Sequence, residues 1–176
     1  PVKIFLAVII AVIAFGFGAH VFPGFAAYPV MDSVVLSEGA APYRKFLSFD
    51  KTIAGLLILG LLVPRLNTRD GWTAMFTQGA IYAALSVIVV VSVALLLGYI
   101  RFYPKWTTLF FPWLLFNFLT CVTEEAFFRG FIQSRLAIGL SRHPRGEMVA
   151  LIVVAALFGL AHFGGGGKSV IVATLA

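Results

Sequence analysis

Three charged side chains stand close together inside an otherwise apolar stretch of the chain: Glu124, Glu125 and Arg129. A charge at the centre of a membrane helix costs about 2.5 to 3.5 kcal/mol on insertion scales, so such side chains must be paired or hydrated. Glu125 and Arg129 are spaced i, i+4 with the acid first, the favoured order for an ion pair on one helix face. Glu124 points about 100° away around the helix and has no cation three or four residues further on. It therefore needs water or a group from another helix, which makes it the stronger functional candidate.

The depth of Glu124 in the apolar stretch supports a functional interpretation. Counting back from Arg135 at about 1.5 Å per residue places Glu124 roughly 16 Å into the stretch, near the middle of a hydrocarbon core about 30 Å thick. The alternative is an interfacial salt-bridge patch where the helix leaves the membrane. An ionisable side chain at mid-membrane depth indicates a functional site by default.

A histidine stands at a similar depth in the next apolar stretch. The same arithmetic from Glu147 places His162 about 22 Å from the basic connection that the two stretches share, so the two depths differ by about one turn. Consecutive spans joined by a short loop pack antiparallel, so Glu124 and His162 can meet, and Gly159 would ease that close approach. The alternative for His162 is a hydrogen-bonding packing residue, while His20 is interpreted as an interfacial side chain.

Other hydrolase signatures are missing from the sequence. No histidine begins a His-Glu-x-x-His zinc motif, and there is no Gly-x-Ser-x-Gly elbow. Cys121, the single cysteine, lies one turn before Glu124, but no neighbouring residue indicates an activated thiolate. Catalytic zinc usually has three protein ligands, and Glu124 and His162 are only two. We therefore expect no metal and no other cofactor, with zinc held by Glu124 and His162 as the alternative.

The elements that must position these residues are membrane helices. Of 176 residues, 61% are hydrophobic and 11% are charged, whereas soluble proteins have about 45 to 50% and about 25%. The fold class is therefore all-α, a polytopic transmembrane helical bundle forming one integral-membrane domain over residues 1–176. The apolar runs predict five spans and the start of a sixth at about residue 169: 4–22, 53–63, 80–100, 109–136 and 149–163. The net charge of +6 suits anionic lipid headgroups, and no basic run indicates a nucleic-acid partner.

Four consecutive glycines, residues 164–167, follow the fifth predicted span. Such a run cannot hold a stable helix, so it must end or break the span. It is interpreted either as a plain turn or as an opening beside His162 that admits a substrate backbone.

These residues resemble the CAAX-protease and bacteriocin-processing family of glutamic-type intramembrane endopeptidases. The resemblance rests on two motifs on consecutive apolar segments. The first is Glu-Glu-x-x-x-Arg, present as Glu124, Glu125 and Arg129, and the second is Phe-x-x-x-His, present as Phe158 and His162.

The resemblance covers mainly residues 107–176 and implies an all-helical membrane bundle with a polar cavity. It implies that Glu124 activates the attacking water and that His162 helps bind the water or the developing oxyanion. It also implies that Glu125 and Arg129 support the base. The expected partners are the lipid bilayer and a membrane-associated peptide or protein substrate, in a multi-pass protein of a prokaryotic plasma membrane. A transporter, scaffold or immunity protein with a buried Glu-Arg site is the non-enzymatic alternative.

The family also uses a later helix that carries a histidine and an asparagine, a pattern that this sequence lacks. The apolar run that begins near residue 169 is only about seven residues long, too short to span a membrane. We therefore expect the given sequence to be a fragment. The intact gene product should continue past Ala176 through at least one more membrane helix that carries the histidine and, one turn later, the asparagine.

Overall fold

The computed structural model describes residues 2–36, 39, 42–102 and 110–176, with only the backbone described for residues 2–4. Residues 107–109, at the start of the segment that carries the predicted motifs, therefore lie outside the described residues. The chain forms two compact units. Unit 1 combines Pro1–Val63 with Tyr103–Ile132, and unit 2 combines Pro64–Phe102 with Gln133–Ala176. The interpretation of the chain as one integral-membrane domain stays a prediction.

The chain is mostly helical, as the apolar runs predict. Helical segments coincide with each predicted span and with the short apolar run that begins near residue 169. Their bounds are α1 (Val2–Gly18), α2 (Phe49–Leu61), α3 (Arg69–Leu96), α7 (Gly146–Ala161) and α8 (Gly167–Leu175). The fourth predicted span is a run of short helical pieces: α4 (Phe110–Phe116), η1 (Asn117–Cys121), α5 (Val122–Glu125), η2 (Ala126–Gln133) and α6 (Ser134–Gly139).

The all-α prediction is wrong for one segment, which forms a two-stranded antiparallel sheet. Strand β1 (Tyr28–Val34) pairs with β2 (Tyr43–Leu47), with Tyr28 opposite Leu47. Aromatic and β-branched side chains in β1 suit a partly buried strand. Because these side chains are interspersed with polar ones, the segment lies outside the apolar runs, and they do not predict the sheet.

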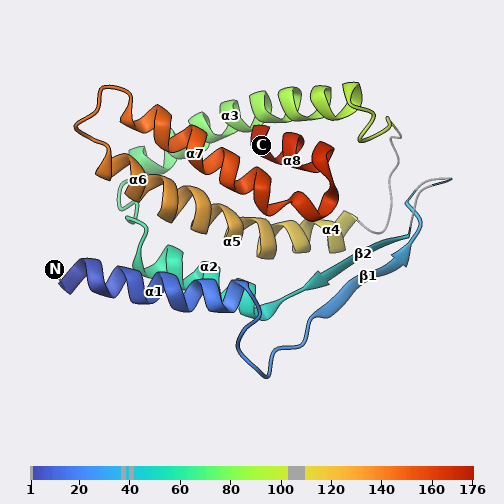
Figure 1. Ribbon diagram of the computed structural model, residues 1–176, viewed down its shortest axis with the longest axis horizontal. Helices are drawn as coiled ribbons and strands as arrows, with labels where there is room; N and C mark the ends of the chain where they lie inside the picture. Colours follow the sequence, from blue (N-terminus) through green and yellow to red (C-terminus); the bar gives the residue numbers. More distant parts are fainter. Residues whose placement is uncertain (1, 37–38, 40–41, 103–109) are drawn as a thin grey trace. The chain divides into compact units, whose positions relative to one another are not determined.

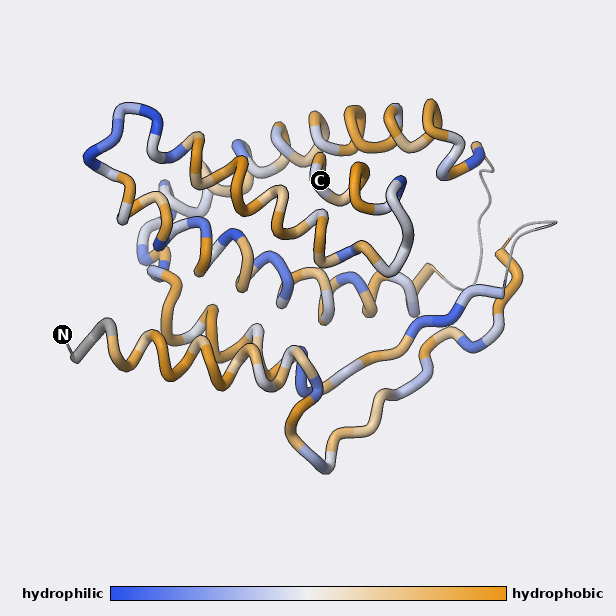
Figure 2. Tube along the Cα trace, in the orientation of Figure 1, coloured by the Kyte–Doolittle hydropathy of each residue, from blue (hydrophilic) through white to orange (hydrophobic). Residues whose placement is uncertain are grey.

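One described helix, α3, is long and apolar enough by itself to cross a bilayer, whereas α1 and α7 are shorter apolar helices. Figure 2 shows the hydrophobic colouring that these helices share. The sequence predicted this span from residue 80, but the helix begins at Arg69 because Thr68 caps its amino end. The Thr68 hydroxyl accepts a hydrogen bond from the Gly71 amide at 3.1 Å, the usual N-cap arrangement. The predicted number of spans is thus supported for one helix and stays a prediction for the others.

The core of unit 1 is built from three alanines and one isoleucine on three helical segments. Ala14 of α1, Ala54 and Ile58 of α2 and Ala126 of the fourth segment are buried together. Figure 1 shows α1 lying along α2. Small residues allow helix backbones to approach closely, which is how membrane helices gain most of their packing energy.

Gly55 marks the closest approach between α2 and α5. A Cβ atom built on Gly55 would overlap the Thr123 hydroxyl and lie 3.0 Å from the Thr123 Cα atom. We expect Gly55→Ala to destabilise the protein by about 1 to 3 kcal/mol, because overpacking a close contact forces backbone shifts. Thermal unfolding in detergent measures this change.

The matched control is Gly60→Ala in the same helix, where the space beyond the glycine is open. Alanine is favoured over glycine inside a helix by about 1 kcal/mol, so this variant should be neutral or slightly stabilised. Equal effects of the two substitutions would contradict the close contact between α2 and α5.

In unit 2, the glycine run ends α7 as predicted. A short 3-10 turn, Phe163–Gly165, follows α7, and Gly166 has a φ of +83°, a backbone conformation that glycine adopts without strain. Gly159 lies against α8, where an added Cβ would overlap the Thr174 hydroxyl. Gly159 thus lets α8 pack closely on α7, and its expected role in the approach of α7 to the helix of Glu124 stays a prediction.

Candidate active site

The fourth segment has an unusual helical geometry around the two glutamates. The turn that carries them, α5, is α-helical, whereas η1 before it and η2 after it are wider π-helical turns. Such turns are rare and occur frequently at functional sites. The Thr123 hydroxyl donates to the Leu119 carbonyl at 2.9 Å, which satisfies one backbone acceptor in this irregular stretch. The two acids thus lie between the two stretches of altered helix geometry.

The ion pair predicted between Glu125 and Arg129 is confirmed. The Arg129 Nε atom lies 3.6 Å from Glu125 Oε2, and the two residues are on neighbouring turns of the segment. Arg129 is the less exposed of the two side chains. An unpaired charge is costly in apolar surroundings. The pair of Glu125 and Arg129 lowers this cost for two of the three charged side chains.

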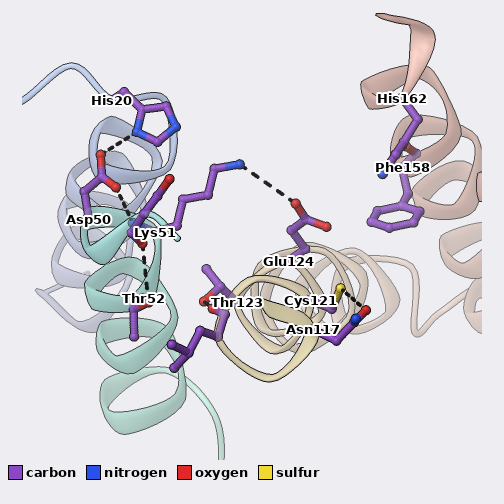
Figure 3. A network of polar contacts seen from close by, with 12 residues as sticks. His20, Asp50, Lys51, Thr52, Asn117, Cys121, Thr123, Glu124, Phe158 and His162 are labelled. Atoms are coloured by element: carbon purple, nitrogen blue, oxygen red, sulfur yellow. Dashed lines mark hydrogen bonds and ion pairs between the residues drawn. The ribbon is translucent and has the colours of Figure 1, made fainter. Parts of the chain in front are cut away.

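Glu124 pairs with a cation on another helix, as the missing local partner required. Its Oε1 atom lies 4.0 Å from the Nζ atom of Lys51 in the first turn of α2 (Figure 3). The two side chains are 30% and 29% exposed respectively. The sequence did not predict Lys51 as the partner of Glu124, although this lysine interrupts the apolar run upstream of the second span. Lys51 and Glu124 are far apart along the chain, so no local spacing indicates their contact.

A second polar pair lies beside Lys51. The Nδ1 atom of His20, just after α1, is hydrogen-bonded to Asp50 Oδ2 at 2.5 Å (Figure 3). Asp50 is only 2% exposed. His20 therefore partners a buried carboxylate on another helix, and its expected place at the membrane interface stays a prediction.

His162 lies at the carboxyl end of α7, in unit 2. Its Nδ1 atom is 2.8 Å from the Phe158 carbonyl oxygen, and its ring packs on the Phe158 ring with centroids 4.7 Å apart. A carbonyl can only accept a hydrogen bond, so Nδ1 carries the proton. The Nε2 atom of the neutral ring is then an acceptor. The spacing Phe-x-x-x-His thus fixes the orientation of the imidazole.

Cys121 and the possible metal ligands have the following surroundings. The Cys121 thiol donates to Asn117 Oδ1 at 3.3 Å, one turn earlier in the segment. Among the residues that the structure describes, no group of three or more His, Cys, Asp and Glu side chains is placed to hold a metal ion.

The structure brings only part of the predicted site together. Glu124, Glu125 and Arg129 lie in unit 1 with Lys51, whereas His162 lies in unit 2. The meeting of Glu124 with His162, and the catalytic role of each residue, remain predictions.

The structure is thus mostly helical, with one described helix able to cross a membrane and with paired acidic and basic side chains in an apolar segment. Residues 104–176 match the family model described as type II CAAX prenyl endopeptidase Rce1-like. The resemblance to the CAAX-protease and bacteriocin-processing family is thereby confirmed. The family consists of integral membrane proteins, and the match implies an intramembrane endopeptidase of the CAAX type. No curated protein and no solved structure matches the chain.

Proposed function

We propose that this protein hydrolyses a peptide bond of a membrane-associated protein or peptide, using a water molecule activated by Glu124. The observation that carries the proposal is the environment of this carboxylate. Glu124 lies inside an apolar segment, is partly exposed, and is compensated by a cation from another helix at 4.0 Å. An intramembrane carboxylate of this kind indicates a functional site, and the family match supplies the class of reaction.

In the proposed reaction, Glu124 accepts a proton from water while the water oxygen attacks the scissile carbonyl carbon. The tetrahedral intermediate then collapses as the carbon-nitrogen bond breaks, and Glu124 returns the proton to the leaving amine. A positioned general base contributes about 10² to 10⁴ in rate. Donors aimed at the developing oxyanion contribute about 10² to 10³ for each group removed. No residue of the chain becomes covalently attached to the substrate.

Glu125 and Arg129 support the base in this proposal without taking part in proton transfer. By formal charge, Glu124 and Glu125 contribute two negative charges, and Lys51 and Arg129 contribute two positive ones. The four-residue cluster is therefore neutral overall, which lowers the cost of holding an ionised base in the membrane.

His162 is assigned to the attacking water in this proposal. Because Nδ1 donates to the Phe158 carbonyl, the neutral ring offers Nε2 as an acceptor for the second proton of the water. This geometry favours binding of the water over donation to the oxyanion, which only the protonated ring could provide.

The proposed substrate is a prenylated peptide or protein anchored in the same membrane, in line with the name of the matching family. The test is incubation of the intact gene product in liposomes with prenylated peptides in H₂¹⁸O, followed by mass spectrometry. We expect one new carboxyl end that carries a single ¹⁸O atom, and no acylated enzyme. Intact substrate after prolonged incubation, with the protein shown to be folded, would overturn the proposal.

The second candidate function is zinc peptidase, and one observation favours it. A histidine that donates from Nδ1 to a backbone carbonyl has the orientation common among metal ligands. Since Glu124 and His162 are only two of the usual three protein ligands, we expect purified protein to contain much less than one zinc ion per chain. Activity should survive prolonged dialysis against a chelator. Stoichiometric zinc by elemental analysis, with activity lost on removal and restored on return, would establish the metal mechanism instead.

A further inference from the structure

Lys51 lies outside the segment that matches the family, yet it is the cation that faces Glu124. We propose that Lys51 is a positioning residue for Glu124, and that the His20–Asp50 pair fixes the start of α2 from which Lys51 reaches the site. This inference rests on the proposed function, because it assigns Glu124 the role of base.

The charge of Glu124 calls for a cation close to it. An ionised carboxylate is costly in apolar surroundings unless a cation lies near it. Arg129 is paired with Glu125 at 3.6 Å, whereas Lys51 lies 4.0 Å from Glu124. Removing the ammonium group of Lys51 would therefore leave Glu124 without this partner and free to rotate away from its present position.

The pair of Glu124 and Lys51 is open to water. Both side chains are about one-third exposed, and their 4.0 Å separation is longer than a direct hydrogen bond. Lysine carries three N–H donors, so its ammonium group can face Glu124 and still bind a water molecule. A purely structural ion pair needs no such access. The geometry thus allows Lys51 to orient the carboxylate and leave it open to the substrate water.

Hydrogen bonds anchor the backbone of Lys51 at the start of α2. The backbone amide of Lys51 donates to Asp50 Oδ1 at 2.9 Å, and Asp50 Oδ2 is bonded to His20. His20 has a φ of +59°, a conformation that is uncommon for residues other than glycine. Such conformations persist where the surrounding structure holds them, and they cluster at functional sites. The His20–Asp50 pair therefore ties the end of α1 to the start of α2 at the residue next to Lys51.

The test compares Lys51→Met and Lys51→Arg with the wild-type intact gene product in liposomes. Loss of the positioning cation should lower kcat about 10²-fold, the size of effect expected when a reacting group is misplaced by about 1 Å. KM should change less than about threefold, because Lys51 is not assigned to substrate binding. Arginine restores the positive charge and should recover most of kcat.

The matched control is Lys45→Met in the same unit. The Lys45 Nζ atom lies 4.5 Å from the centre of the Phe116 ring, so this substitution removes a partly buried lysine that faces an aromatic ring. It should leave kcat within about threefold of wild type. Thermal unfolding of each variant separates loss of folding from loss of the chemical step.

A second variant tests the anchoring by Asp50. Asp50→Asn should lower kcat in the same direction as Lys51→Met. The Asp50→Asn/Lys51→Met double variant should lose no more than Lys51→Met alone, because residues that act through one another are not additive.

The outcomes distinguish this inference from the proposed function. Suppose that wild type is active and Glu124→Gln is inactive. Full activity in folded Lys51→Met, or an equal loss of activity in Lys51→Arg, then overturns the role of Lys51 and leaves the proposed function standing. A Glu124→Gln variant as active as wild type overturns both. Additive losses in the double variant overturn the anchoring role of Asp50.

Discussion

Glu124→Gln is expected to lower kcat by about 10³-fold, within the range that a positioned general base contributes. Glutamine keeps the size of the side chain but cannot accept a proton from water as a carboxylate does. Thermal stability should stay near that of wild type, because the partly exposed side chain makes one long-range ion pair at 4.0 Å. Steady-state kinetics and thermal unfolding in detergent measure the two quantities.

The matched control is Glu125→Gln, one residue along the same helical turn. This substitution weakens the 3.6 Å pair with Arg129, so it should lower thermal stability more than Glu124→Gln does. It should retain measurable peptidase activity. Equal losses of activity and of stability in both variants would contradict the division of roles between the two acids.

His162→Ala is expected to lower kcat by about 10²-fold, a lower-range value for a group that positions a reacting molecule. The substitution removes the Nε2 acceptor that the Phe158 hydrogen bond orients. Stability should change little, because the imidazole is partly exposed and α7 retains its backbone hydrogen bonds. Single-turnover cleavage measures the chemical step without product release.

The matched control for His162 is His143→Ala in the same unit. His143 lies in the exposed turn before α7, where its Nδ1 accepts a hydrogen bond from the Arg145 amide at 3.2 Å. Its loss should leave kcat unchanged. A His162→Ala variant with wild-type kcat would remove this histidine from the proposed mechanism.

Local spacing predicted one pair of the site, because the i, i+4 spacing places Glu125 beside Arg129. The hydrogen bond between the His162 ring and the Phe158 carbonyl also lies within one helix, but it was not predicted, since His162 was expected to face Glu124. The same reasoning indicated that Glu124 lacks a local cation, which Lys51 supplies from α2.

The sequence could not predict the contacts between segments that are far apart along the chain. His20 and Asp50 are 30 residues apart, and Lys51 reaches a different helix. No periodicity encodes such pairings, which depend on how α1, α2 and the fourth segment pack through small residues. The hairpin was missed for another reason, because its strands mix polar with aromatic and β-branched residues.

The close packing of α2 at Gly55 also affects the charges of the proposed site. Gly55 lets α2 approach the fourth segment closely, and this approach brings Lys51 within 4.0 Å of Glu124. A bulkier residue at Gly55 would therefore disturb both packing and the charge balance of the site. The stability of unit 1 and the activity of Glu124 should accordingly decline together in Gly55→Ala.

The most direct test of the central claim is the single-turnover rate of peptide cleavage in liposomes. Wild-type intact gene product and Glu124→Gln would be compared on the same prenylated peptide, with both proteins shown to be folded. We expect a rate ratio of about 10³, with the new carboxyl end of the wild-type product formed from water. Equal rates for the two proteins would contradict the role of Glu124 as the base that activates water.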